Sequence, residues 1–115
     1  MQIVAAAIIL VSFSLSGYAE VTLGTREVLL ENETVEVVRL SYPVGSESGM
    51  HTHQHPSRAA YFVKGGKVEL VPGDPHKPHR VLEVPDGQSL FLPATTHNVK
   101  NIGTTEIIII ETEIK

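Results

Sequence analysis

The chain of 115 residues contains no cysteine. It therefore has no disulfide framework and no thiolate site, and any transition-metal ligands must be histidines or carboxylates. The sequence also lacks an excess of positive charge, because its formal net charge is -4. Domains that bind nucleic acid carry a basic surface, so we expect no nucleic-acid partner.

The length of the chain is enough for one compact domain and too short for two. Hydrophobic residues make up 42% of the sequence and charged residues 19%, as in ordinary globular proteins. We therefore expect one hydrophobic core.

Residues 1–19 differ from the rest, because they carry no charge and are apolar from Ile3 to Val11. The run is too short to span a bilayer comfortably as a helix, and it ends in the small-x-small pattern of Gly17 to Ala19. We interpret it as a signal peptide cleaved after Ala19, which predicts a periplasmic or secreted protein with no stable membrane span after processing. Since no Lys or Arg precedes the apolar run, a misassigned start codon, an uncleaved anchor or a buried N-terminal element stays open.

After residue 19 the sequence shows no sustained helical periodicity, and short β-branched or apolar segments alternate with turn signals. The expected strands are Thr25 to Leu30, Glu33 to Tyr42, Ala59 to Val63, Lys67 to Val71, Arg80 to Val84, Ser89 to Leu92, His97 to Asn101 and Glu106 to Ile114. We expect Ala59 to Val63 and Lys67 to Val71 to form a hairpin. The four isoleucines near the C-terminus indicate a strand buried on both faces, or one with a face in a subunit contact. The pattern predicts an all-β sandwich or small barrel.

Three histidines lie close together in the sequence, at His51, His53 and His55. Successive side chains of a strand alternate between its faces, so His51 and His53 can point the same way and share one metal ion. His55 has the same parity and is either a further ligand or, because Pro56 follows it, a residue at the rim. Two imidazoles at this spacing are half of a metal site.

The segment from Gly45 to Gly65 resembles the first sequence motif of the cupin superfamily. That motif has a glycine, five residues, His-x-His, three or four residues, a glutamate, six residues and a second glycine. Gly45, His51, His53 and Gly65 occupy the matching positions.

The segment from Gly87 to Asn101 resembles the second cupin motif, with Gly87, Pro93, His97 and Asn101 in its characteristic positions. Thr95 stands where a glycine is usual, and the loop is one residue shorter than the motif. The end of the chain is similar to small single-domain cupins that include the beta-alanine degradation type.

The resemblance implies a double-stranded β-helix, the jelly-roll barrel of cupins, as a single domain over residues 20–115. It also implies that His51, His53 and His97 converge on a divalent metal such as Fe, Mn, Ni or Zn. Neutral imidazoles suit these metals, and three of them leave positions open for water or a small-molecule ligand.

The family's glutamate ligand corresponds to Arg58 in this sequence, or to Ser57 if three residues are counted after His53, and neither side chain is a carboxylate. Arginine has no acceptor atom and stays protonated, so it cannot replace a carboxylate ligand, and near a dication it is repulsive. Three alternatives follow: a three-histidine site of weakened affinity, a site that has lost its metal, or an Arg58 that points elsewhere. Arg58 itself is either a solvated or salt-bridged side chain or an anchor for a substrate carboxylate, which its forked donors suit.

Tyr61, Phe62 and Phe91 are expected in the core or the pocket wall. Phe62 shares strand parity with Arg58, so both are candidate ligand-binding residues, together with His55.

Two classes of function remain open. The first is an exported metalloenzyme, an oxygenase, isomerase or lyase, that acts on a small organic molecule such as a carboxylate. The second is a non-catalytic cupin that binds a metal or a small ligand. His76 and His79 lie in a proline-rich loop and are expected to face solvent, with a loose surface metal trap as the alternative. The long isoleucine strand predicts an exposed sheet edge, and we expect a homodimer.

Overall fold

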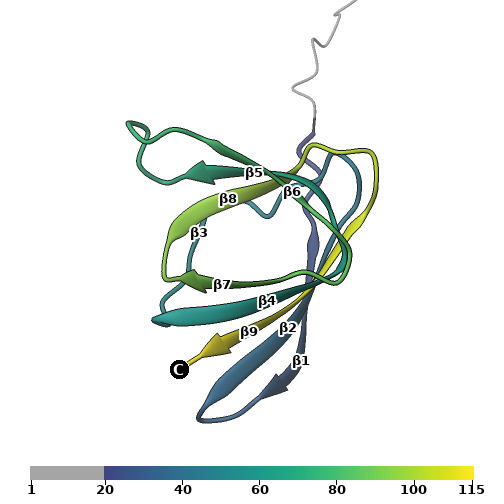
Figure 1. The fold of residues 1–115 in the computed structure, drawn as a ribbon. Coiled ribbons are helices and arrows are strands. Elements are labelled where there is room, and N and C mark those ends of the chain that lie inside the picture. Colours follow the sequence, from purple (N-terminus) through teal and green to yellow (C-terminus); the bar gives the residue numbers. More distant parts are fainter. Residues whose placement is uncertain (1–19) are drawn as a thin grey trace, which may run out of the picture.

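The computed structural model describes residues 20–115 (Figure 1). These residues form nine β-strands and no helix. The strands are β1 (Thr25–Glu31), β2 (Val35–Tyr42), β3 (His51–Thr52), β4 (Ser57–Lys64), β5 (Gly66–Pro72), β6 (Arg80–Val84), β7 (Ser89–Pro93), β8 (Thr96–Asn101) and β9 (Ile107–Ile114). Within this part of the chain no helix is long and apolar enough to cross a membrane. The predicted signal peptide, residues 1–19, lies outside the described residues.

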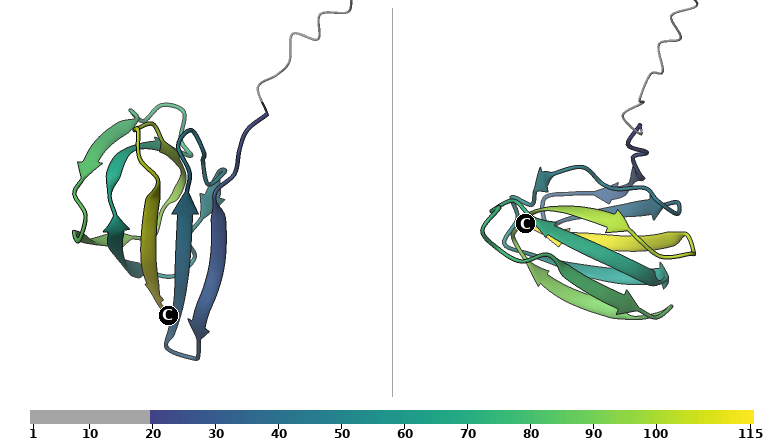
Figure 2. Two further views of the ribbon diagram at one scale, coloured as in Figure 1. Left: turned by 90° about the vertical axis from the view of Figure 1, so that its right-hand side faces the viewer. Right: turned by 90° about the horizontal axis from the view of Figure 1, so that it is seen from above.

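The strands form two antiparallel sheets that enclose a common interior (Figure 1, Figure 2). One sheet has five strands in the order β1-β2-β9-β4-β7, and the other has four in the order β3-β8-β5-β6. Strands far apart in the sequence are neighbours in both sheets, such as β2 with β9 and β3 with β8. This is the double-stranded β-helix, and the prediction of an all-β jelly-roll barrel is confirmed.

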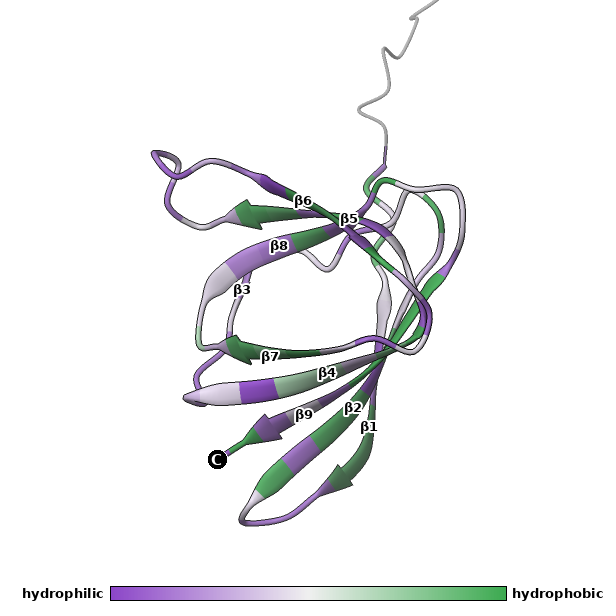
Figure 3. Cartoon of the chain, in the orientation of Figure 1, coloured by the Kyte–Doolittle hydropathy of each residue, from purple (hydrophilic) through white to green (hydrophobic). Residues whose placement is uncertain are grey.

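Side chains alternate between an inner and an outer face along the strands. In β4, Arg58, Ala60 and Phe62 are buried, whereas the residues between them are exposed. In β9, Ile107 and Ile109 are buried. The hydrophobic core joins them to residues of other strands: Tyr42, Val68, Val84 and Val99. Figure 3 shows β9 changing from hydrophobic to hydrophilic toward its C-terminal part, so the polar residues of this strand follow its buried isoleucines.

The predicted hairpin between Ala59 to Val63 and Lys67 to Val71 is wrong. β4 pairs with β7 and β9 in one sheet, whereas β5 pairs with β6 and β8 in the other. The chain crosses between the sheets at Gly65, where a Cβ atom would lie 1.9 Å from the carbonyl oxygen of Val84. The glycine is therefore required by the close approach of two backbones and not by a hairpin turn.

The isoleucine run of β9 is neither buried on both faces nor at a sheet edge. Ile107 and Ile109 are buried, and Ile108 and Ile110 are half-buried on the other face. β9 lies between β2 and β4, and the edges of its sheet are β1 and β7. The edge argument for a homodimer is therefore removed, and the homodimer stays a prediction.

Two of the three predicted core aromatics point outward. Tyr61 is 46% exposed and Phe91 is 70% exposed, whereas Phe62 is 5% exposed. Tyr61 precedes Phe62 in β4 and so lies on the opposite face of the strand, and Phe91 pairs with Ala59, which is also exposed. Residue type alone misplaced them, and strand parity places them correctly.

Candidate metal centre

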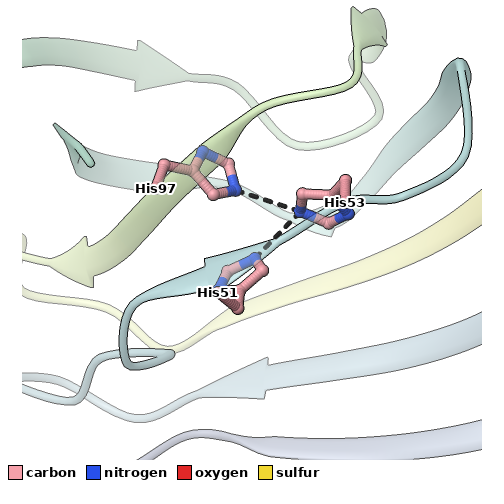
Figure 4. Close-up of side chains that lie close together, drawn as sticks. All are labelled: His51, His53 and His97. Atoms are coloured by element: carbon pink, nitrogen blue, oxygen red, sulfur yellow. Dashed lines mark hydrogen bonds between the residues drawn. The ribbon is translucent and has the colours of Figure 1, made fainter. Parts of the chain in front are cut away.

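Three imidazoles meet inside the barrel (Figure 4). The Nε2 atom of His53 lies 2.9 Å from Nε2 of His51 and 3.1 Å from Nε2 of His97. His53 and His97 are buried, and His51 is half-buried. The predicted residues are therefore brought together, with the same type of nitrogen from each ring pointing to a common centre.

Backbone pairing positions each of these histidines. His51 in β3 lies directly opposite His97 in β8, in an antiparallel pair whose next members are Thr52 and Thr96. His53 follows the end of β3, and its backbone N–H donates a hydrogen bond of 2.9 Å to the carbonyl oxygen of Thr95. The strand is thus shorter than the alternation argument assumed, yet the backbone still turns both imidazoles to one side.

Burial keeps two of the imidazoles uncharged. Burial is the main reason that the pKa of His97 is lowered to about 3. The positive charge of Arg58 and the other two histidines lower it further. Burial likewise lowers the pKa of His53, although its hydrogen bond to Glu113 acts in the opposite direction. Neutral imidazole is the form that binds a metal, so the site is prepared for a cation at neutral pH.

His51 reaches the cluster through a fixed ring nitrogen. Its Nδ1 atom lies 2.9 Å from the carbonyl oxygen of Gly49. A carbonyl oxygen only accepts, so Nδ1 carries the hydrogen and the lone pair of Nε2 faces His53. The backbone before β3 therefore holds this ring ready to bind a cation.

Two carboxylates from β9 stand behind His53, and the sequence prediction missed both. The Nδ1 atom of His53 lies 2.5 Å from Oε1 of Glu113 and 3.8 Å from Oε1 of Glu111. Both glutamates are buried. They share the parity of Ile107 and Ile109, so the alternation of β9 was the signal that could have found them.

Arg58 points into the interior, toward these carboxylates. Its side chain is 6% exposed, and Nη1 donates a hydrogen bond of 3.0 Å to Oε2 of Glu111. Its Nε atom is buried and has no hydrogen-bond partner within residues 20–115. Arg58 is therefore a buried, salt-bridged side chain and not a solvated one.

The cluster opens on a cavity of about 590 Å³, a size suited to a small organic molecule. Its wall includes the three histidines, Arg58 and Phe62. His55 also lines it, and the Nε2 atom of His55 lies 3.7 Å from Oε2 of Glu113. His55 is half-buried and does not join the three-imidazole cluster. Most of the remaining wall is apolar and comes from both sheets, for example Leu70 of β5 and Leu92 of β7.

The two histidines of the proline-rich loop are not among the residues that line this cavity. His76 and His79 are exposed, as expected. The Nδ1 atom of His79 lies 3.9 Å from a carboxylate oxygen of Glu69.

The donor set fits a divalent transition metal. Two imidazole nitrogens that bind one ion at about 2.1 Å lie about 3.0 Å apart at the right angle of an octahedral site and about 3.4 Å apart at the tetrahedral angle of zinc. The separations of 2.9 and 3.1 Å here are closer to the octahedral value. Three neutral imidazoles are also the donors that Fe, Ni, Zn and similar metals accept.

Comparison with known proteins identifies the family of the chain. No protein-family model matches the chain. The chain is 33% identical over 90 residues to the beta-alanine degradation protein BauB of Pseudomonas aeruginosa. The aligned region covers 76% of this chain and 90% of that protein. A crystal structure of a cupin domain from Bordetella pertussis matches with a TM-score of 0.75 and 27% identity, covering 84% of this chain and 97% of that one. The chain belongs to the cupin superfamily.

A more distant structure agrees with the cupin fold. A protein with a double-stranded β-helix domain from Klebsiella pneumoniae matches with a TM-score of 0.64 and 22% identity, covering 80% of this chain and 76% of that one. At that identity the match supports the fold alone. The predicted membership of the cupin family is confirmed by the relative at 33% identity and the Bordetella pertussis cupin domain.

Proposed function

We propose that this cupin binds one divalent transition metal through His51, His53 and His97, and holds a small organic ligand in the cavity beside it. The observation that supports this most directly is the convergence of three Nε2 atoms, with spacings of 2.9 and 3.1 Å around His53. Zn, Fe, Mn and Ni all fit such a donor set.

A metal at this position would supply Lewis acidity to a ligand atom in the cavity. The residues of the chain would bind and orient the ligand. Phe62 and the apolar wall exclude water from its hydrocarbon part, and Arg58 gives the interior a fixed positive charge beside the histidines. An oxygenase, isomerase or lyase reaction on a small molecule is the enzyme form of the proposal.

We infer a carboxylate-bearing ligand as the first class to test. Arg58 lines the cavity; Glu111 accepts from its Nη1, and its Nε, which has no partner within residues 20–115, is the donor that we propose for a ligand carboxylate. The relative BauB is named for beta-alanine degradation, and beta-alanine is itself a small carboxylate. His55, at the cavity wall, is the second polar contact proposed for such a ligand.

The alternative is a non-catalytic cupin that binds a metal or ligand without turnover. It is favoured by the state of the two carboxylates in the cavity wall, Glu111 and Glu113. Glu111 is paired with Arg58 and Glu113 with His53, so each is engaged and neither is set apart as a general base.

Elemental analysis tests the metal directly, on protein purified without a nickel column. The proposal expects about one equivalent of a transition metal in the wild type and its loss in His53→Ala. His76→Ala, a change in the exposed loop, serves as the control that keeps the metal. A wild type without stoichiometric metal after growth and purification in Fe, Mn, Ni or Zn would refute the proposal.

Turnover is tested on the metal-loaded protein. Oxygen uptake and product analysis with beta-alanine, other small carboxylates and diketones separate the two classes. Reaction with one of them supports the enzyme, whereas tight binding without reaction supports the non-catalytic alternative.

Export and self-association complete the proposal as predictions. If the protein is exported, we expect cleavage after Ala19, so that the mature chain begins at Glu20. Mass spectrometry of the protein from its natural host measures this. A homodimer expects twice the monomer mass in gel filtration with light scattering, and a monomer mass would contradict it.

A further inference from the structure

The imidazole of His53 lies between two groups of different chemistry. On its Nε2 side are the Nε2 atoms of His51 and His97. On its Nδ1 side are the carboxylates of Glu113, at 2.5 Å, and Glu111, at 3.8 Å. His53 comes from the connection between β3 and β4, and both glutamates come from β9 in the five-stranded sheet. The ring therefore links parts of the chain that are 60 residues apart.

We propose that Glu113 is a positioning residue, which holds His53 in the tautomer with hydrogen on Nδ1 and so aims its Nε2 lone pair at His51 and His97. A carboxylate oxygen accepts hydrogen bonds and does not donate them, so the hydrogen of this short contact belongs to Nδ1. A buried carboxylate behind a ligating histidine raises the basicity of the ring and fixes its orientation.

The same reasoning already fixes His51, whose Nδ1 donates to the carbonyl oxygen of Gly49. With both rings in this tautomer, two lone pairs face each other across 2.9 Å and no hydrogen lies between them. Such an arrangement is repulsive by itself and becomes favourable when a cation binds to both nitrogens. Glu113 would thus convert three neighbouring histidines into a cation site.

Glu111 and Glu113 also form a group with His53 whose ligand atoms lie within 4.8 Å of one another, so a second cation on that side is the competing explanation. Arg58 argues against it. Its guanidinium already pairs with Glu111 at 3.0 Å, so that carboxylate is not free to bind a cation. One carboxylate is therefore neutralised by arginine, and the other is left to orient the histidine.

The inference rests on the proposed function for its purpose, but the tautomer is measured without any metal. In chelator-treated, 15N-labelled protein, long-range 1H–15N correlation spectra show which ring nitrogen of His53 carries hydrogen. We expect hydrogen on Nδ1 in the wild type. Glu113→Met removes the acceptor and is expected to move hydrogen to Nε2 in much of the population. Glu113→Gln keeps an oxygen acceptor and is expected to retain the wild-type pattern.

Zinc affinity, measured by competition with a chromophoric chelator, tests the consequence. We expect Glu113→Met to bind zinc about 10- to 100-fold more weakly and Glu113→Gln to recover part of the loss. Glu106→Met, an exposed change just before β9, is the control for loss of a negative charge and is expected to bind as the wild type does.

The outcomes separate the two proposals. Hydrogen on Nε2 of His53 in the metal-free wild type, or an unchanged tautomer in a folded Glu113→Met, would overturn the role of Glu113. The expected tautomers, with no binding of Fe, Mn, Ni or Zn by the wild type, would support that role and refute the metal function. If Glu113→Met does not fold, the wild-type and Glu113→Gln spectra still decide the tautomer.

Discussion

Arg58 and Glu111 form an ion pair inside the barrel, with 3.0 Å between Nη1 and Oε2 and with both side chains 6% exposed. The two residues lie on adjacent strands, β4 and β9, on the inner face of the five-stranded sheet. Two charges buried this deeply lose most of their hydration, and each depends on the other for compensation. The pair is therefore a point where a single substitution has a large cost.

Removal of one partner should destabilise the protein strongly. Arg58→Met leaves Glu111 buried without its cation, and we expect a loss of about 3–5 kcal/mol in the free energy of unfolding. The double variant Arg58→Met/Glu111→Met should lose less than this single variant, because no charge is then left uncompensated. Urea unfolding in the presence of a chelator measures both. Arg39→Met, which removes a pair between exposed side chains of Arg39 and Glu27, should cost less than about 1 kcal/mol. Equal stability of Arg58→Met and this control would contradict the prediction.

Metal should stabilise the folded chain, because the three-histidine site exists in that state. At free zinc of 100 times the dissociation constant, the free energy of unfolding should rise by about 2.7 kcal/mol. Thermal unfolding with zinc and then with a chelator checks the gain and its reversal. His97→Ala should remove the gain, whereas His76→Ala in the exposed loop should keep it. A gain of the same size in His97→Ala would place the zinc elsewhere.

Stability of the metal-free protein should fall as the pH is lowered from about 6.5. Burial lowers the pKa of His97 to about 3 in the folded chain, and the unfolded chain binds a proton near pH 6.5. Between these values the unfolded state holds more protons, so the free energy of unfolding rises with pH by up to about 1.4 kcal/mol per pH unit for this residue. Urea unfolding at pH 7.5 and 5.5 should show a smaller difference for His97→Gln than for the wild type. The same difference in both proteins would contradict the assignment.

Gly65→Ala should be far more harmful than an ordinary glycine replacement. Its new Cβ atom would meet the carbonyl oxygen of Val84 at 1.9 Å, so two backbones must separate where the chain crosses between the sheets. We expect a loss of more than about 3 kcal/mol, or no folding. Gly45→Ala is a matched comparison, since Gly45 has a φ of 80° and no atom within 4 Å of the new Cβ. It should cost about 1–2 kcal/mol, from backbone strain alone. Thermal and urea unfolding rank the two variants, and equal losses would contradict the steric argument.

The fold could be predicted from the sequence because strand alternation and turn residues are local patterns that recur along the chain. Alternating strands and turn residues predict an all-β sandwich or small barrel, the resemblance of the segments around His51 and His97 to cupin motifs implies a jelly roll, and the comparisons agree. The hairpin at Gly65 was mispredicted because a Gly-Gly pair permits a turn, whereas the clash that requires Gly65 comes from Val84, distant in sequence. Non-local backbone contacts of this kind have no signal in a short window.

The site was predictable in its histidines and not in its surroundings. The motif spacing singled out His53, but its closest polar partner is Glu113, at the far end of the chain. The isoleucines before Glu111 drew attention to hydrophobic burial, although the same alternation turns Glu111 inward. Arg58 was identified as an anomaly because it was compared with a motif, and its partner became visible only through the pairing of β4 with β9.

The contact between His53 and Glu113 has a mechanical consequence. His51 and His97 belong to the four-stranded sheet, whereas Glu113 belongs to the five-stranded one. His53 comes from the connection between β3 and β4, so its hydrogen bond of 2.5 Å to Glu113 ties the histidine cluster to the five-stranded sheet. A cation bound to all three histidines would therefore also connect β9 with the four-stranded sheet through His53 and Glu113. Binding of a cation and the relative motion of the two sheets would then be coupled through this one hydrogen bond.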